Sequence, residues 1–496
     1  MTSDKRPAAS FAGSLLGIQG APGAIVLGLS LAFLGAYAWH LWNVSFLGWD
    51  TYPILAASQV GSFTELFDKL FRPLGDGLVG PQYFRPLLTL MIAVEWPLWG
   101  LNAAPYLWLN VIIFGLCALE LFRLARRLET SATGPMVAAI TALFFLAHPV
   151  SQSVVPFVAR RPDLLSVLFV LMALRLDHKA RFTGSRKIAV LALMAVAAAI
   201  LSKEAAIVLP LLIAASRWLF PATGNPLREA VRGFLISGTV LLVAAAPRFL
   251  VLDGLGGRYG QAPPHHVLRG VFAGVFLPEQ NGVRIWTGLL LLIAGLVLLF
   301  QLGRRSDAFR LKDLRLLLLG AFWLLSYAVL FAYAGRVSAW YVMIIVAGAA
   351  LGVGTVVAAA FQALQQKTAS RSMAILVLLG AFFLHGHFLW VSPLCQPMKG
   401  LAVASRWADG YLDTLEQKLQ DNADRIETDL WPQTFNNIAV MRPNTVRGWL
   451  KLKFPERDIV VLPGDTIDSD GKTVVVLGAE NAKTGIRRQR LPRHNP

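Results

Sequence analysis

Charged residues are scarce in this chain of 496 residues: they make up 15% of it, whereas hydrophobic residues make up 55%. The mean hydropathy is +0.56. Soluble domains carry about 25% charged residues, so the scarcity excludes an ordinary soluble globular protein. The apolar residues come in runs of roughly 18 or more, the length that crosses a bilayer as a helix. The composition therefore predicts a polytopic membrane protein.

Cysteines and nucleotide-binding motifs are also lacking. Of the two cysteines, Cys117 falls within a predicted span and Cys395 beyond the last one, so no disulfide between them is expected. There is no Walker A pattern and no glycine-rich fingerprint after a strand, which argues against a nucleotide site. No repeat of tetratricopeptide length occurs. The first apolar run lacks a small-residue cleavage site, so we interpret it as an uncleaved anchor.

The apolar runs predict about eleven transmembrane helices. They lie near 22–41, 105–122, 135–148, 163–177, 187–201, 204–220, 233–252, 285–302, 314–334, 338–360 and 373–392. With the N-terminus in the cytoplasm, every predicted cytoplasmic loop is basic, as the positive-inside rule requires. This topology explains the net charge of +17 and excludes nucleic acid as the partner. It also places the C-terminus outside the cytoplasm, and the Ala, Leu, Gly and Arg content points to a bacterial plasma membrane.

Two long polar regions lie outside on this topology. The first outer loop, about 42–104, contains WDTY and YFRPL and a helical pattern with Phe63, Phe67 and Phe71 on one face. Residues 396–496 form the second region, with an amphipathic helix near 401–426 and two β-branched runs around DSDG, a predicted hairpin turn. We therefore expect an all-α transmembrane module, 1–395, and a small α+β extracytoplasmic domain, 396–496.

Ionisable residues collect at the outer ends of the predicted spans. Such residues are costly in lipid and indicate a functional site. Cations there could hold the phosphate of a lipid, and an acid could take a proton from an incoming hydroxyl. The acids are Asp50, Asp163 and Glu204, and the bases are Arg85, Arg160, Arg161, Lys203 and Arg336.

Three segments carry a family resemblance. They are WD followed by YFRPLLTL and LWLNVIIFGLCALELFRLARRL, then FFLAHPVSQSVVPFVARRPDLLSVLFVLMAL, then LSKEAAIVLPLLI. Over roughly residues 45–215 the chain resembles the lipid-phosphate-sugar-dependent glycosyltransferases of the GT-C class, in particular the transmembrane and tetratricopeptide-repeat O-mannosyltransferases and their bacterial relatives. The later GRVSAWY is similar to an Arg-and-Tyr motif of such enzymes. The repeats are missing, so the acceptor could be a protein, a polysaccharide, a lipid or another glycan.

The resemblance implies roles for these residues in an inverting transfer from a polyprenyl-phosphate sugar to a hydroxyl. Asp50 would be the general base. Asp163 would be a second acid that orients a substrate or helps to bind a divalent metal where one is used. The remaining candidates would bind the donor phosphate or position a residue that does: Arg160 or Arg161, Lys203, Glu204, Arg336 and Arg85.

Each of these residues also has a structural interpretation. Asp50 and Asp163 could cap helices, and either neighbouring arginine, Arg160 or Arg161, could extend to lipid headgroups. Lys203 and Glu204 could pair with each other, Arg336 could anchor a span end, and Arg85 could fix a loop helix.

Metal binding and transport are two further interpretations. The histidine pairs at 265–266 and 385–387 lack a third ligand, and the DxD at 468–470 lies in a predicted turn, so no metal site is predicted. A transporter, a flippase or a non-catalytic subunit of a cell-envelope glycan assembly would also have many spans. A secondary transporter usually shows matched halves, which this sequence lacks. The grouping of charges at one membrane face favours the enzyme.

Overall fold

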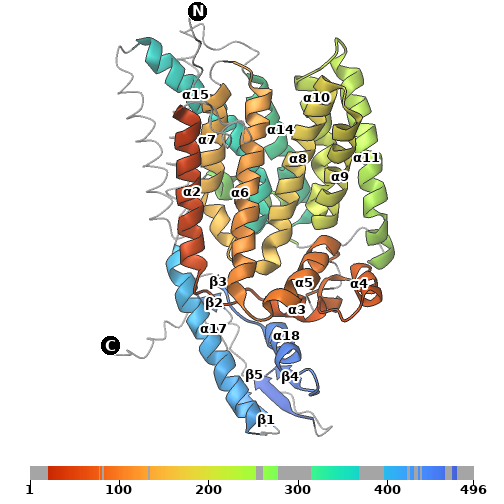
Figure 1. The fold of residues 1–496 in the computed structure, drawn as a ribbon, viewed down its shortest axis with the longest axis vertical. Helices are drawn as coiled ribbons and strands as arrows, with labels where there is room; N and C mark the ends of the chain where they lie inside the picture. The colour runs from red at the N-terminus through yellow and green to blue at the C-terminus, as the bar shows by residue number, and fades with distance from the viewer. Residues whose placement is uncertain are drawn as a thin grey trace, which may run out of the picture.

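The structure is a computed structural model that is mostly helical (Figure 1). It describes residues 21–77, 79–80, 83–131, 134–252, 261–276, 314–367, 396–421, 425–428, 434–435, 438–463 and 472–477.

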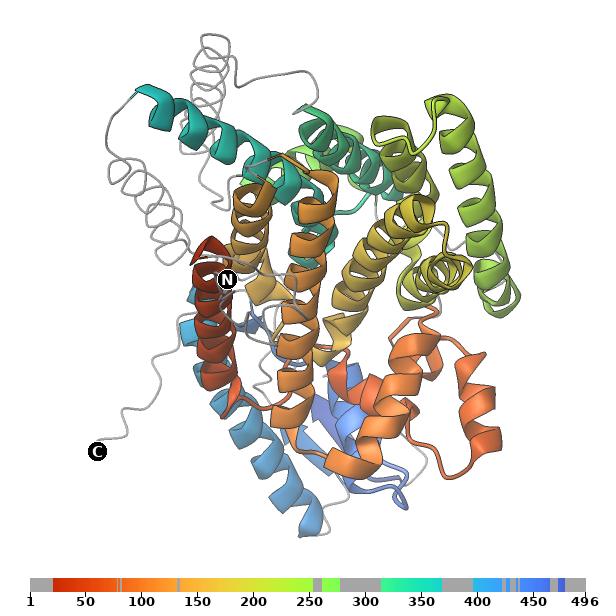
Figure 2. The same cartoon turned by 45° about the horizontal axis from the view of Figure 1, so that its top comes forward.

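Long helices form a bundle, in which several pairs of sequence neighbours pack side by side (Figures 1 and 2). The bundle helices are α2 (Ala21–Leu41), α6 (Ala103–Leu128), α7 (Gly134–Ala147), α8 (Arg161–Thr183), α9 (Arg186–Ser202), α10 (Leu209–Leu219), α11 (Pro226–Val251), α14 (Arg315–Ala334) and α15 (Val342–Lys367). A shorter helix, α12 (Pro264–Phe276), packs against α14 and α15.

The helices agree with nine of the predicted spans within a few residues at most ends. In the described part of the chain, four helical segments are long and apolar enough to cross a membrane: Ala103–Leu128, Pro226–Val251, Arg315–Ala334 and Ala339–Ala359. The predicted spans 285–302 and 373–392 lie outside the described residues, so the count of about eleven stays a prediction. The sixth predicted span begins as a 3-10 helix, η4 (Glu204–Val208). The backbone is extended at Lys203, so the helical structure is interrupted between α9 and η4.

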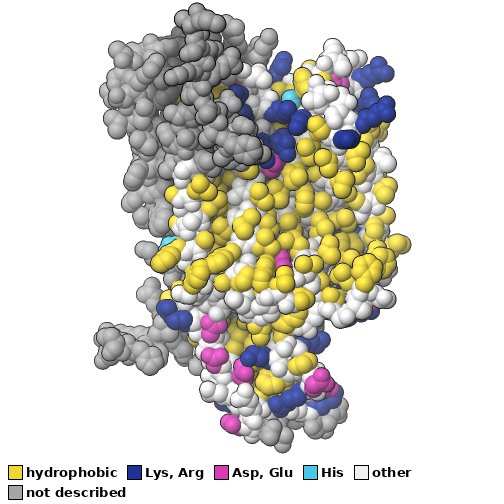
Figure 3. Space-filling view, viewed as in Figure 1, with side chains coloured by type: hydrophobic (Ala, Val, Ile, Leu, Met, Phe, Trp, Pro, Cys, Tyr) yellow, Lys and Arg dark blue, Asp and Glu magenta, His cyan; other side chains and the backbone are white. Residues whose placement is uncertain are grey.

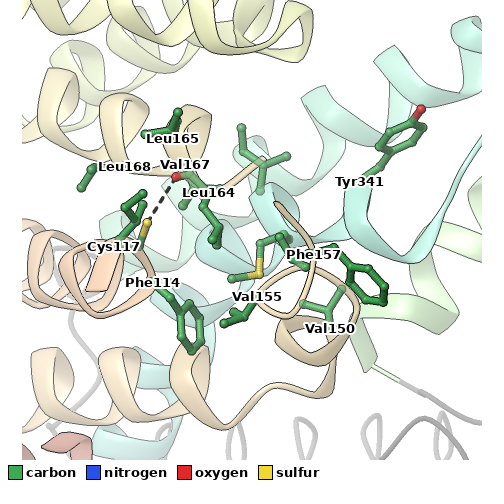
Figure 4. Packing of buried hydrophobic residues seen from close by; sticks show 14 of the residues in the cluster. Phe114, Cys117, Val150, Val155, Phe157, Leu164, Leu165, Val167, Leu168 and Tyr341 are labelled. Atoms are coloured by element: carbon green, nitrogen blue, oxygen red, sulfur yellow. Dashed lines mark hydrogen bonds between the residues drawn. The ribbon is translucent and has the colours of Figure 1, made fainter. Parts of the chain in front are cut away.

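Helix packing in the bundle is close and mostly apolar. Figure 4 shows the contact of α6 with α8, where Phe114 and Cys117 lie against Leu164. The thiol of Cys117 donates a hydrogen bond to the Leu164 carbonyl at 3.4 Å, and both residues are fully buried. Lipid tails are as apolar as these side chains, so in a bilayer the helices associate through close van der Waals packing of this kind and not through removal of apolar surface from water.

The segment that the sequence predicts as the first outer loop forms three short helices, α3 (Thr51–Ala57), α4 (Phe63–Leu70) and α5 (Pro86–Trp99), and a 3-10 turn, η1 (Leu74–Gly77). The predicted amphipathic pattern is confirmed in α4, which Ser62 caps by accepting a bond from the Glu65 amide. Its aromatic face is uncovered: Phe63 is 82% exposed and Phe67 is 57% exposed. This face suits the interfacial placement that the sequence predicts.

In its described part, the C-terminal segment contains helices α17 (Gln396–Gln420) and α18 (Pro443–Lys453) and five short strands, while a separate α+β domain over 396–496 stays a prediction. The strands are β1 (Arg425–Thr428), β2 (Thr434–Phe435), β3 (Ile438–Ala439), β4 (Val460–Pro463) and β5 (Val474–Leu477). The predicted hairpin is wrong. Strands β4 and β5 pair in parallel, Val460 opposite Val474, and β5 lies between β1 and β4. A tight turn joins antiparallel strands only, so two parallel neighbours need a crossover.

The two ends of the bundle differ. The C-terminal segment and helices α3 to α5 lie at the lower end of Figure 1. Figure 3 shows a broad band of hydrophobic side chains, with Lys and Arg gathered at the upper end, over α10 and α11. Exposed basic residues there are Arg228 and Arg232, at the start of α11. We call these the lower and upper ends below.

Candidate functional site

Asp50 lies at the lower end, where the chain turns into α3. Gly48 adopts φ +99°, which favours glycine, and a Cβ there would lie 3.2 Å from the Phe157 ring. Thr51 donates to the Leu47 carbonyl at 2.7 Å and closes the turn. Asp50 is the N-cap residue of α3, but its side chain makes no cap hydrogen bond. The capping interpretation of Asp50 is therefore wrong.

Four arginines lower the pKa of the Asp50 carboxylate electrostatically, and each comes from a different segment. They are Arg85, Arg160, Arg336 and Arg442. Among the described residues none forms a direct ion pair with it. Burial raises the pKa of Asp50, and the four positive charges oppose that rise without cancelling it. The carboxylate is thus partly buried, lies within electrostatic range of four arginines and forms no ion pair with any of them.

Arg85 pairs with Glu204, which begins the 3-10 helix η4 between α9 and α10. It is the N-cap residue of α5, followed by Pro86, and it is buried. Its guanidinium lies 3.5 Å from Glu204 and over the Tyr83 ring at 4.9 Å. Glu204 also lies 3.8 Å from Arg248 of α11. Glu204 therefore pairs with Arg85 and Arg248, and the interpretation in which it pairs with Lys203 is wrong.

Arg160 is enclosed by two aromatic rings. Its guanidinium lies 4.0 Å from the centroid of Phe157 and 4.0 Å from that of Trp340, and it donates to the Ser153 carbonyl. Burial lowers the pKa of Arg160 to about 10, while Asp163 and Asp50 favour the charged form. The side chain therefore stays cationic at neutral pH, and the stacking fixes its direction.

Asp163 and Lys203 form a buried ion pair between the start of α8 and the end of α9. Lys203 is 3% exposed and Asp163 is 6% exposed. The Lys203 ammonium also lies 4.3 Å from the centre of the Tyr341 ring. Both residues line a cavity of about 10 Å³ with Ser166, whose hydroxyl has no hydrogen-bond partner among the described residues. A cavity of this volume admits about one water molecule.

Arg161 points away from this cluster although it is adjacent to Arg160. It is fully buried, with two contacts to Glu95 at 2.5 and 2.7 Å, one to Asn110 at 2.7 Å and one to the Tyr106 carbonyl at 3.1 Å. These bonds attach α5 to α6 and α8. Because every part of its guanidinium is occupied, we keep Arg160 rather than Arg161 in the proposed site.

The structure adds residues that the sequence patterns did not indicate. Arg442, just before α18, stacks on Trp49 at 3.4 Å. Glu95 holds Arg161, and Arg248 holds Glu204. Glu95 could have been found as an acid inside an apolar helix, but nothing in the sequence connects Arg442 with Trp49. Arg336 lies just after α14, which ends at Ala334, and is partly buried.

No metal centre is defined in the described part of the chain, where no three His, Cys, Asp or Glu residues group together. His265 and His266 are exposed on α12. The second histidine pair and the DxD lie outside the described residues. His148 is buried, accepts from the Val150 amide and contacts the Val275 carbonyl at 2.9 Å.

Comparisons with known proteins find solved structures that are similar to this chain. No family model matches the chain, and no curated protein matches its sequence. The chain is similar to ArnT from Cupriavidus metallidurans bound to undecaprenyl phosphate, with 15% identity, a TM-score of 0.43, and coverage of 78% of this chain and 72% of that one. It is also similar to the Archaeoglobus fulgidus oligosaccharyltransferase tethered with an acceptor peptide, with 14% identity, a TM-score of 0.42, and coverage of 86% and 63%. Both likenesses are distant in sequence and in structure.

Proposed function

We propose that the protein is an integral-membrane, inverting glycosyltransferase that moves a sugar from a polyprenyl phosphate to a hydroxyl acceptor. The observation that carries the proposal is the Asp50 carboxylate, unpaired among four arginines from separate segments. A carboxylate with a raised pKa suits a general base, because its basicity is closer to the working pH. Cations suit a phosphate leaving group. In this proposal the lower end faces away from the cytoplasm.

The reaction needs one base and a positive cradle. The acceptor hydroxyl gives its proton to Asp50 while its oxygen bonds to the anomeric carbon. The bond from that carbon to the phosphate oxygen breaks, and the electron pair leaves with the polyprenyl phosphate. Arg85, Arg160 and Arg336 would stabilise the charge that grows on the phosphate. Attack opposite to the leaving group inverts the anomeric centre.

The two other acids take different parts in this proposal. Glu204 positions Arg85, and Asp163 neutralises Lys203, so both hold cations in place. The small cavity beside Asp163 and Lys203 leaves room for a donor oxygen or a water to contact this pair. Asp50 is left as the acid that can exchange a proton with the acceptor.

A transfer assay tests the proposal. Proteoliposomes with the native protein, Asp50→Asn or Asp76→Asn receive radiolabelled polyprenyl-phosphate sugars and an envelope extract, and the label leaving the lipid fraction is followed. We expect Asp50→Asn to slow transfer by about 10²- to 10⁴-fold, the usual contribution of a general base. Asp76 is the matched control: it is exposed in the same loop at φ +50°, a conformation that Asn tolerates.

Two outcomes would contradict the proposal at different levels. Transfer that survives Asp50→Asn would remove Asp50 from the role of base and keep the enzyme. Absence of transfer by the native protein from several sugar donors would contradict the enzyme itself and favour a transporter or a non-catalytic subunit.

A further inference from the structure

The C-terminal segment is joined to the site by contacts that converge on Trp49 and the start of α3. The Thr445 hydroxyl donates to the Trp49 carbonyl at 2.6 Å and accepts from the Arg442 amide at 2.9 Å. The Arg442 guanidinium lies 3.4 Å from the centroid of the Trp49 ring. Trp49 is thus held by both its backbone and its ring, and it directly precedes Asp50.

Close backbone packing continues this contact along α18. A Cβ on Gly448 would lie 2.4 Å from the Pro53 nitrogen, so the two helices α18 and α3 touch at a position that only glycine fits. Ser45, upstream of the same turn, donates to Asp409 of α17 at 2.6 Å, and its amide donates to Ser405 at 2.7 Å. The segment around Asp50 is therefore clamped by the C-terminal segment from two directions.

We propose that Arg442 is a positioning residue for the transfer reaction: it fixes Trp49, and thereby Asp50, and adds to the positive charge near that carboxylate. This inference rests on the proposed function, because it assigns Asp50 the role of base. It also makes the C-terminal segment a functional part of the site. The charged groups that affect the pKa of Asp50 are Arg85 from the start of α5, Arg160 from the turn before α8, Arg336 from the α14–α15 connection, and Arg442.

Charge and stacking make separable contributions at this position. Arg442 is exposed to solvent although its guanidinium stacks on Trp49. An exposed cation–π contact contributes about 0.5–1 kcal/mol, so losing it alone should change the rate by no more than about five-fold. Losing the charge also removes one of the four effects that lower the pKa of Asp50, so that pKa should rise further.

The pH dependence of transfer tests the inference. In Arg442→Gln we expect kcat to fall by up to about five-fold, since the stacking is lost, and the acidic limb of the pH–rate profile to move to higher pH. In Arg442→Lys the charge is kept, so the limb should stay in place while kcat falls less.

Arg406→Gln is the matched control, because Arg406 is an exposed arginine of α17 in the same segment. An unshifted limb with a native kcat in Arg442→Gln would overturn the inference, and so would an unshifted limb with a lower protein level, which indicates a structural role only.

A second measurement works without any transfer activity. In a Cys117→Ala, Cys395→Ala background, Asp50→Cys is modified by an anionic and by a cationic methanethiosulfonate. Four arginines should make the anionic reagent react faster, and Arg442→Gln should lower this preference several-fold, which Arg406→Gln should not do. A preference lowered by Arg442→Gln, together with no transfer by the protein with native Asp50, would reject the proposed function and keep the contact geometry. An unchanged preference, together with transfer by the protein with native Asp50, would reject the inference alone.

Discussion

The two ends of the bundle both contain buried charges, but they arrange them differently. At the upper end the buried and half-buried carboxylates that the structure describes have close partners: Glu120 lies 2.5 Å from Arg175 and 3.1 Å from Arg123. Asp177 lies 2.5 Å from Arg217, and Glu229 lies 2.8 Å from Arg181. Glu229 also accepts from the amides of Ala222 and Thr223, which closes the loop between α10 and α11.

At the lower end several charged residues form ion pairs, but Asp50 does not take part in one among the described residues. Asp163 pairs with Lys203, Glu204 pairs with Arg85, and Arg161 pairs with Glu95, yet the Asp50 carboxylate has four nearby arginines and no direct partner among the described residues. A carboxylate held in a close ion pair is not free to take a proton from a substrate, and losing the pair costs stability. An open arrangement of one acid and several cations costs stability and is retained where it can act on a substrate. This difference distinguishes the structural end from the candidate site.

Breaking a closed pair at the upper end should give the largest effect, and the effect should be on stability. Asp177→Asn leaves Arg217 and Arg181 without their shared carboxylate, and both side chains are about 11–12% exposed. We expect a loss of about 3 kcal/mol in the free energy of unfolding, measured as a lower Tm in detergent, with a nearly native transfer rate below that Tm.

The control for this change is Asp68→Asn, because the Asp68–Arg72 pair on α4 is exposed and should contribute almost nothing. A native Tm for Asp177→Asn, or a transfer rate reduced at a temperature where the variant is fully folded, would contradict the structural assignment of the upper end.

Removing a cation from the open site should give a smaller effect, and the effect should be on binding. In Arg336→Gln we expect the donor KM to rise about ten-fold, which is the loss expected for one charge-assisted hydrogen bond to a phosphate. Steady-state kinetics with varied donor checks this. Arg269→Gln on α12 should leave KM unchanged, because Arg269 is exposed and is not among the four arginines around Asp50. Equal KM values for the two variants would exclude Arg336 from donor binding.

Ionic strength should give the smallest effect and should separate the two ends without a mutation. Raising salt from about 0.05 to about 0.5 M shortens the Debye length severalfold, so attraction of an anionic donor to the open site weakens. We expect the donor KM to rise a few-fold while the Tm changes little, because the upper-end pairs are shielded from solvent. A KM that is independent of salt would argue against a phosphate held by the arginines.

Much of the fold could be predicted from the sequence, because hydrophobic length and basic loops are local properties. The break at Lys203, the amphipathic α4 and the amphipathic α17 all follow from periodicity and spacing. The β4–β5 pairing does not, since a turn-like DSDG between two short β-branched runs has the same local pattern whether the strands pair in a hairpin or through a crossover.

The site was predictable in its membership and not in its partners. Sequence position placed Asp50, Arg160 and Arg336 at one end of the bundle. It could not tell Arg160 from Arg161, because adjacent residues at a helix start point in different directions and their partners, Trp340 and Glu95, come from distant segments. It also allowed Lys203 to pair with its neighbour Glu204, although each is held by a residue from another helix.

The sequence by itself determined that the chain is a membrane protein with its chemistry-bearing residues at one end, because burial in lipid constrains composition and length at every position. Tertiary structure alone decided which of those residues are closed into pairs and which one stays open. It also decided that Arg442, from the far end of the chain, lies on Trp49. Such contacts depend on how the helices and the C-terminal segment pack in space. A local sequence pattern does not show which residues from distant parts of the chain come into contact.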